Sequence, residues 1–260
     1  MALPEYTSAT QLSTYAWCPR KFRFRYLDSA EPEYRSVSLA LGSVVHGVIE
    51  WWFEARRVGG TPTVNDAMNI LRADFAAAMH DDVRLGKWTP GDLRDHAGRL
   101  VRCFLEQLGE TEVQGTEMRF ELSLYDPDTG ECMERPLIGY FDLYLGGGRA
   151  LEIKTARSEY TPLSLTTNLQ FGAYLMALDE HSEAGELELA VIVKNRVPRI
   201  QRLKLHPNAR SERWFLKAAT TIEAAIQSGH FPPAPGFGCG GCEFQRRCLG
   251  QVGEADAEAA

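Results

Sequence analysis

The chain has 260 residues, of which 44% are hydrophobic, and carries a formal net charge of −7 at pH 7. This length suits one large domain or two small ones, and the composition is that of a globular protein with a hydrophobic core. No apolar run approaches the roughly 20 residues that cross a bilayer. No charged and then apolar leader opens the chain. The sequence therefore predicts a cytoplasmic protein without a membrane segment.

The first half of the chain is expected to be helical. Thr7 or Ser8 starts a short helix over residues 7–27, and an apolar stripe predicts a longer one over 39–57. Two further helices are predicted over 64–80 and 91–109, separated by a break at Trp88-Thr89-Pro90-Gly91. The second half alternates apolar and polar residues, which predicts strands over 118–124, 136–145, 149–155, 187–194 and 199–205 and helices over 164–179 and 208–228.

Helices followed by strands with crossover helices predict an α/β core that carries an N-terminal helical insertion. We expect a single domain over residues 1–252, with its helical part at about 39–112 and its sheet at about 115–228. Two end segments of that domain, 15–26 and 236–250, hold four of the six cysteines. The acidic, alanine-rich tail at 253–260 is expected to be disordered.

Four cysteines predict a shared site at the two ends of the chain. Cys239, Cys242 and Cys248 form a C-x₂-C-x₅-C pattern, and Cys18 stands alone near the N-terminus. If Cys18 is the fourth ligand, a metal or cluster joins the two ends. The spacing alone fits a Cys₄ zinc site as well as an iron–sulfur cluster. A disulfide fits only an oxidising compartment. The other two cysteines, Cys103 and Cys132, are interpreted as plain thiols.

A predicted hairpin places two carboxylates opposite each other. If Gly146-Gly147-Gly148 is a three-residue loop, Leu145 pairs with Arg149, which puts Asp142 opposite Glu152 and Lys154 on the same face. Facing carboxylates repel, and Mg²⁺ or Mn²⁺ between them removes that penalty. Lys154 is suited to contact a phosphate oxygen or to orient a water molecule. The alternative is a solvent-facing hairpin in which Glu152 pairs with Lys154.

Further candidate residues are ordinary when taken singly. His46 lies beside the apolar stripe of its helix, and Gln170 and Tyr174 share a helix face at i and i+4. The net charge is not typical of a nucleic-acid binder, although local patches decide binding. Basic residues gather at 20–25, where they alternate with aromatic residues, at 194–204, and at 246–247.

Taken together, these residues resemble the PD-(D/E)XK nuclease superfamily in its RecB-like, iron–sulfur branch, which includes the AddB nuclease domain and the CRISPR-associated exonucleases. The likeness runs nearly end to end and depends on the order of six motifs, each of which is weak or moderate alone. Those motifs are Tyr15–Phe22 with its Cys18, Gly42–His46, Gly139–Asp142, Glu152–Thr155, Gln170–Tyr174 and Cys239–Cys248. The branch usually has Asp where this chain has Glu152, which puts the metal preference in question, and Glu117 stands where the branch often has an extra glutamate.

The resemblance implies a restriction-endonuclease-like mixed sheet flanked by helices, with an N-terminal helical insertion. A 4Fe-4S cluster on Cys18, Cys239, Cys242 and Cys248 would join the N- and C-terminal segments. His46, Asp142, Glu152 and the backbone carbonyl of Ile153 would hold Mg²⁺ or Mn²⁺. Lys154 would position the attacking water, and Gln170 and Tyr174 would contact DNA near the scissile phosphate.

The implied function is that of a metal-dependent DNA exonuclease. We expect hydrolysis of phosphodiester bonds from single-stranded DNA ends, in repair, recombination, phage or CRISPR-adaptation metabolism, with a helicase or a CRISPR-adaptation protein as a partner. The aromatic and basic residues at 20–26 would suit a single strand. One alternative is a DNA-end-binding partner subunit that keeps the fold. Another is a cluster-based redox sensor or transcription factor, for which no helix-turn-helix pattern is found.

Overall fold

A five-stranded mixed sheet lies at the centre of the computed structural model, which describes residues 3–80, 82–181 and 185–250. The strand order is β3-β4-β5-β6-β7, with β5 and β6 parallel and the other neighbours antiparallel. The strands are β3 (Gly115–Leu122), β4 (Leu137–Gly146), β5 (Arg149–Ala156), β6 (Glu186–Val193) and β7 (Arg199–Leu205). A parallel pair needs a crossover connection, and α6 (Pro162–Thr166) and α7 (Leu169–His181) lie within the segment that joins β5 to β6.

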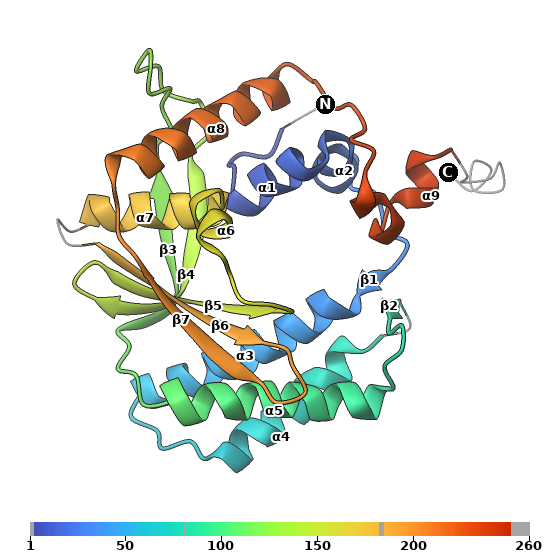
Figure 1. Ribbon diagram of the computed structural model, residues 1–260, viewed down its shortest axis with the longest axis vertical. Helices are drawn as coiled ribbons and strands as arrows, with labels where there is room; N and C mark the ends of the chain where they lie inside the picture. The colour runs from blue at the N-terminus through green and yellow to red at the C-terminus, as the bar shows by residue number, and fades with distance from the viewer. Residues whose placement is uncertain (1–2, 81, 182–184, 251–260) are drawn as a thin grey trace.

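Helices cover both faces of the sheet (Figure 1). The helices α3 (Val37–Arg57), α4 (Val64–Ala78) and α5 (Pro90–Leu108) pack on one face, against Leu143, Leu151, Ile153, Ala190 and Ile192. The helices α1 (Ala9–Trp17), α7 and α8 (Ala209–Gln227) pack on the other, against Ala150, Leu187, Leu189, Val191 and Val193. β6 is buried on both faces, and its residues Leu189–Val193 form a continuous apolar run, whereas β5 carries Glu152 and Lys154 among its apolar residues. A small parallel pair, β1 (Arg35–Ser36) with β2 (Val83–Arg84), lies beside α3.

The predicted α/β fold with a mixed sheet flanked by helices is confirmed. Side-chain caps fix several helix starts close to the predicted residues. Thr63 and Asp66 form a capping box at α4, and the Thr89 hydroxyl accepts the Asp92 N–H at α5, where Pro90 occupies the first helical position. The predicted tail at 253–260 lies outside the described residues.

The single helix predicted over residues 7–27 is wrong, because the chain breaks at Cys18. Cys18 has extended backbone angles, φ −162° and ψ 110°, which suits a residue that precedes proline. Pro19 then starts α2 (Pro19–Phe22), and the π-helical turn η1 (Arg23–Leu27) follows. Cys18 therefore lies at a corner between two helices.

The helix predicted over residues 164–179 is also two helices. The break falls between α6 and α7, where the Asn168 side chain accepts the backbone N–H groups of Gln170 and Phe171. An asparagine side chain at this position is a typical N-cap, so it ends one segment and starts the next. The cap also places Gln170 in the first turn of α7.

The two ends of the described chain meet beside α1 and α2 (Figure 1). After α8, the chain leads into η2 (Phe237–Gly241) and α9 (Gln245–Cys248). The Arg20 N–H donates to the Pro232 carbonyl over 3.1 Å, and the Tyr15 hydroxyl donates to the His230 carbonyl. Phe22 stacks on Phe231 in a small core cluster of its own. Segments more than two hundred residues apart are thus joined by protein contacts alone.

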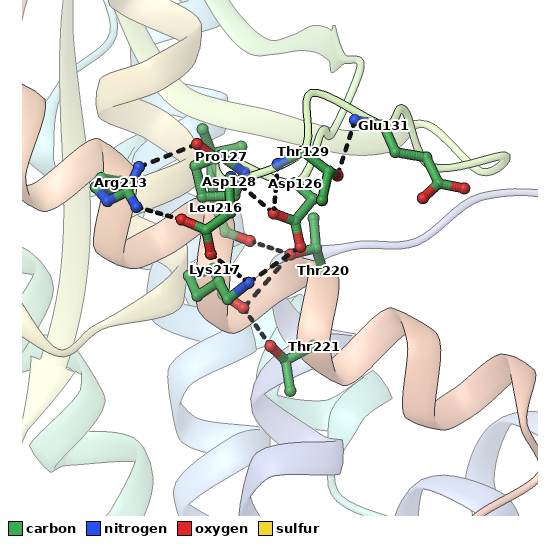
Figure 2. A network of polar contacts seen from close by, with 10 residues as sticks. All are labelled: Asp126, Pro127, Asp128, Thr129, Glu131, Arg213, Leu216, Lys217, Thr220 and Thr221. Carbon is green, nitrogen blue, oxygen red and sulfur yellow. Dashed lines mark hydrogen bonds and ion pairs between the residues drawn. The ribbon is translucent and has the colours of Figure 1, made fainter.

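Polar contacts fasten the loop between β3 and β4 to α8 (Figure 2). At the surface, Lys217 contacts Asp126 and Asp128 over 3.1 and 2.7 Å. Beneath them, Arg135 makes a two-pronged contact with the fully buried Glu223, over 2.6 and 2.7 Å. None of the helices in the described ranges is both long and apolar enough to cross a membrane.

Candidate active site

The hairpin between β4 and β5 has the predicted register away from its turn, but the turn itself differs from the prediction. The predicted pairing of Leu145 with Arg149 is wrong, because Gly146 pairs with Arg149 across a two-residue Gly147-Gly148 turn. An irregularity between Tyr144 and Gly146 then shifts the strands by one residue. The register beyond it pairs Leu143 with Leu151, which is the predicted one. The three glycines have φ of 85°, 61° and 71°, a region that glycine adopts without strain.

Asp142 and Glu152 lie together next to that paired segment. One oxygen of Asp142, Oδ2, accepts the backbone N–H of Ile153 over 2.7 Å, so the carboxylate is tied to β5. Glu152 is 2% exposed, and its Oε1 accepts a hydrogen bond from Lys154 Nζ over 2.5 Å. Its other oxygen, Oε2, is buried and has no hydrogen-bond partner among the described residues. The predicted alternative of a solvent-facing hairpin is therefore wrong for Glu152, although its pairing with Lys154 is present.

Burial controls the charge of this site. It raises the pKa of Glu152 to about 8, with the Asp142 charge adding to the shift and the Lys154 charge opposing it. Burial disfavours the charged form of Lys154, but the Glu152 and Asp142 carboxylates outweigh it and raise the pKa of Lys154. Without a metal, the folded protein therefore favours the protonated form of Glu152 and the charged form of Lys154.

His46 lies beside Asp142 and comes from α3, one of the helices that cover the sheet. It lies in the middle of α3, and its Nδ1 is 3.7 Å from Asp142 Oδ2. Burial lowers the pKa of His46, while the Asp142 charge opposes that shift. A neutral imidazole can donate a lone pair to a cation. The structure therefore brings His46, Asp142, Glu152 and Lys154 together from three elements.

Gln170 and Tyr174 form a hydrogen-bonded chain that ends on β4. Gln170 Nε2 donates to the Tyr174 hydroxyl over 2.8 Å, and that hydroxyl donates to the Tyr140 carbonyl over 2.8 Å. Tyr174 is 4% exposed, and burial together with the Glu152 and Asp142 charges raises its pKa. Through this bond Tyr174 holds β4 at Tyr140, two residues before Asp142. Gln170, in contrast, is partly exposed.

Two glutamates that the sequence left without a role lie near these carboxylates. Glu117 has a φ of 46°, which is uncommon for a residue with a side chain. Glu117 as a residue is exposed to solvent. Partial burial of its carboxyl group, together with the charges of Asp142 and Glu50, nevertheless raises the pKa of Glu117 to about 7. Glu50 follows His46 by one turn of α3. The i, i+4 spacing of His46 and Glu50, which puts both on one face of α3, is the sequence signal that could have identified Glu50.

The donor chemistry at this site fits a hard divalent cation. Carboxylate oxygens are preferred ligands of Mg²⁺ and Mn²⁺. The unpartnered Oε2 of Glu152 is the kind of buried atom that a cation satisfies. Among the described residues, however, no group of three or more His, Cys, Asp or Glu side chains that could hold a metal ion is found. The fit therefore depends on the Asp142–Glu152 pair.

The four cysteines at the chain ends line one cavity of about 250 Å³. Cys18 comes from the corner between α1 and α2, Cys239 from η2, Cys242 from the turn after it, and Cys248 from the end of α9. All four are free thiols. The cavity wall also includes Trp17, whose ring packs against Gly238 so closely that an added Cβ would lie 1.9 Å from it. The four cysteines thus share one cavity, although in the described ranges they form no group that could hold a metal ion as they stand.

The segment 20–26 does not present its aromatic side chains to solvent as expected. Phe22 is fully buried in the cluster with Tyr15, and Phe24 packs against Phe244. Lys21 and Arg25 both contact the Glu243 carboxylate. The expectation of a single-strand-binding segment here is wrong for these residues, because the alternation serves to bind the C-terminal segment.

Two carboxylates and a lysine lie on adjacent strands of a helix-flanked mixed sheet, an arrangement that agrees with an α/β nuclease. The family model of the PD-(D/E)XK nuclease superfamily matches residues 6–249, so the chain belongs to that superfamily. No match is found among curated proteins.

A solved structure shares the fold at low sequence identity. A Eubacterium rectale protein named "Putative exonuclease" is similar at 13% identity with a TM-score of 0.61, covering 94% of this chain and 88% of that one. A second structure, named SSO0001, has 16% identity and a TM-score of 0.38, covering 94% and 96%. The first likeness supports the fold.

Proposed function

We propose that the protein is a metal-dependent DNA exonuclease that hydrolyses phosphodiester bonds from single-stranded ends. The observation that carries the proposal is the Asp142–Glu152 pair, two adjacent carboxylates beside Lys154 with a buried unpartnered oxygen on Glu152. Membership of the nuclease superfamily, and the name "Putative exonuclease" of the similar Eubacterium rectale protein, support nuclease activity.

Each site residue has a proposed role. His46, Asp142, Glu152 and the Ile153 carbonyl would hold Mg²⁺ or Mn²⁺, which when bound stabilises charge on the attacking and leaving oxygens. Lys154 would hold a water molecule or a phosphate oxygen in place, since its ammonium already lies against Glu152. Gln170 would contact DNA near the scissile phosphate. Tyr174 would position β4 through its contact with the Tyr140 carbonyl, in addition to any DNA contact.

We further propose that the cysteine cavity holds a 4Fe-4S cluster, as in the RecB-like branch of the superfamily. The support is that all four cysteines line one cavity and that four thiolates are the usual ligands of such a cluster. A Cys₄ zinc site is the alternative at the same residues. Iron with near-equal acid-labile sulfide in anaerobically purified protein would support the cluster, whereas one zinc without sulfide would replace it.

The cellular setting is proposed from the resemblance alone. Repair, recombination, phage or CRISPR-adaptation metabolism in the cytoplasm would each supply DNA ends, with a helicase or a CRISPR-adaptation protein as partner. The competing function is that of a DNA-end-binding subunit without activity. Asp142, Glu152 and Lys154 are all present and lie together, which favours an active enzyme over an inactive binding subunit.

The test uses linear single strands labelled at the 5′ or the 3′ end, and a closed circular single strand of the same sequence. We expect loss of the linear strands with Mg²⁺ or Mn²⁺, none in EDTA, and none with the Asp142→Asn variant. Digestion of the circle would show an endonuclease. Full activity in excess EDTA would overturn the metal-dependent proposal.

A further inference from the structure

A groove lined by four arginines lies between α4 and α5, on the outer side of the helix layer. Its volume is about 230 Å³. Arg72 comes from α4, and Arg94, Arg99 and Arg102 come from α5. All four are exposed, and Asp95 is the acidic residue among those that line the groove. In a chain of net charge −7, this is a local excess of positive charge.

These arginines have weak partners or none. Arg72 donates to the Asn69 amide, Arg99 contacts a ring nitrogen of His96, and Arg94 lies 3.4 Å from its neighbour Asp95. No hydrogen bond or ion pair of the Arg102 side chain is found among the residues that the structure describes. Elsewhere, arginines such as Arg56 and Arg119 contact glutamates over 2.7 and 2.6 Å.

Arg99 and Arg102 are three residues apart on α5, a spacing at which like charges repel, while Asp95 stands four residues before Arg99 and attracts it. Four guanidinium groups facing one groove, with a single carboxylate to compensate them, leave their hydrogen-bond donors available. Guanidinium groups form paired hydrogen bonds with phosphate oxygens, and a row of them matches a polyanion.

Further cationic residues continue from the groove toward the proposed active site. The buried His96 contacts Arg99, and burial together with the charges of Arg99 and Lys194 lowers the pKa of His96. Lys194 follows β6, and its backbone N–H donates to the Ala156 carbonyl at the end of β5 over 2.7 Å. The exposed Arg157 comes next, and burial together with the Arg157 charge lowers the pKa of Lys194.

β5 is also the strand that carries Glu152 and Lys154. Because α5 packs against β6, and β6 pairs with β5, the arginines on α5, Lys194 after β6 and Arg157 after β5 lie on neighbouring elements. We name this set the cationic track: Arg72, Arg94, Arg99, Arg102, Lys194 and Arg157.

We propose that the cationic track binds the phosphate backbone of the DNA strand whose end is cleaved. This proposal rests on the proposed nuclease function. The groove lining contains no aromatic side chain on which a base could stack, so the contact is to phosphates and is independent of sequence. An acidic protein is the competing occupant, and the chemistry of a regular row of phosphates favours DNA.

The test measures DNA binding in EDTA, so that it does not depend on cleavage. Fluorescence anisotropy with a labelled single strand and a labelled duplex is recorded across a salt series for the wild type and for Arg99→Gln/Arg102→Gln. We expect about tenfold weaker binding, and a slope of log affinity against log salt that is shallower by roughly 0.7–0.9 for each lost phosphate contact. A Lys194→Gln/Arg157→Gln variant should behave in the same way.

The matched control is Arg56→Gln/Arg119→Gln, which removes the same charge from two arginines paired with glutamates. We expect its affinity and salt slope to stay near the wild-type values, and thermal unfolding should show that every variant is folded. Equal losses in the control and track variants, or no loss in the track variants, would overturn the proposal. So would displacement of the DNA by polyglutamate at matched charge. Absent cleavage with intact track-dependent binding would count against the nuclease proposal alone.

Discussion

Glu152 shows how one buried position sets the chemistry of the site. The side chain lies in the sheet core next to Asp142, so the folded protein favours its protonated form. Lys154 compensates part of the charge, and the second carboxylate oxygen has no partner in the described structure. A cation would satisfy that oxygen and displace the proton. The residue thus links metal affinity to pH.

The metal-free protein should lose stability as the pH rises. The pKa of Glu152 is about 8 in the folded protein against an ordinary value of 4.5. Its contribution is therefore fully present below about pH 4.5 and is lost as the pH rises through about 8. Thermal unfolding in EDTA should show a falling Tm over this range, a smaller fall in Glu152→Gln, and a gain from Mn²⁺ that grows with pH. Identical pH profiles for wild type and Glu152→Gln would contradict this.

Replacing Lys154 by Ala should abolish cleavage while leaving the fold in place. The ammonium lies against Glu152 at the proposed reaction centre, and its side chain is 23% exposed. Removing it also leaves Glu152 without its ion pair, so the fold is measured alongside the lost activity. Cleavage assays and circular dichroism check this, with Lys204→Ala on β7 as the control. Near-normal cleavage by Lys154→Ala would remove Lys154 from the mechanism.

At the level of elements, the loop between β3 and β4 is held to α8 at two depths. The contacts of Asp126 and Asp128 with Arg213 and Lys217 lie at the surface, where water and salt screen them (Figure 2). The Arg135–Glu223 pair lies beneath, with side chains 9% and 0% exposed. The same arginine also donates to the Pro4 carbonyl. One ion pair therefore connects a loop, a helix and the N-terminal segment.

Glu223→Ala should destabilise the protein by about 3–5 kcal/mol, because it leaves the Arg135 guanidinium buried without a counter-charge. The double variant Arg135→Met/Glu223→Leu should recover much of that loss, since an apolar pair of similar volume leaves no buried charge. Lys217→Ala is expected to change stability far less. Urea unfolding of the three variants measures this. Equal unfolding midpoints for Glu223→Ala and Lys217→Ala would show that the buried ion pair contributes no more to stability than the surface one.

At the scale of the whole molecule, the two ends are joined by more than cysteines. Lys21 and Arg25 contact Glu243, the Glu33 N–H donates to the Glu243 carbonyl, and Phe22 stacks on Phe231. A cluster on the four cysteines would add a covalent closure of a loop longer than two hundred residues. In the chain-entropy model that closure contributes about 5 kcal/mol. The His46–Tyr174 region lies within the loop rather than at its closure.

Cys18→Ala or Cys248→Ala should therefore give colourless, less stable protein. The Asp142–Glu152 site should still bind Mn²⁺, because none of its residues contacts the cysteine cavity wall. Iron and sulfide content, Tm and Mn²⁺ affinity check these points. Cys103→Ala, and Cys132→Ala in the loop before β4, are the controls and should keep colour and stability. A full complement of iron in Cys18→Ala would exclude Cys18 as a ligand.

The sequence alone predicted most of the helices and strands, although two of the predicted helices are divided in the structure. Hydrophobic periodicity predicted the α/β order, because apolar residues recur at 3.6 or 2 residues when one face is buried. Asp142 and Glu152, which the hairpin prediction placed opposite each other, lie together, and the four cysteines of the predicted shared site line one cavity. The alternation at 20–26 was misread, since a pattern of aromatic and basic residues looks the same whether the aromatic rings face solvent or a partner segment.

Only the tertiary structure determined what surrounds these residues. The burial that shifts the pKa of Glu152, and the contact between Tyr174 and the Tyr140 carbonyl, depend on elements that are distant in sequence. The arginine groove arises because α4 and α5 pack side by side, so its four arginines have no common motif. Local pattern determines which face of a helix or strand is apolar. The partner of each polar side chain, and hence its charge and chemistry, is determined by how those elements pack.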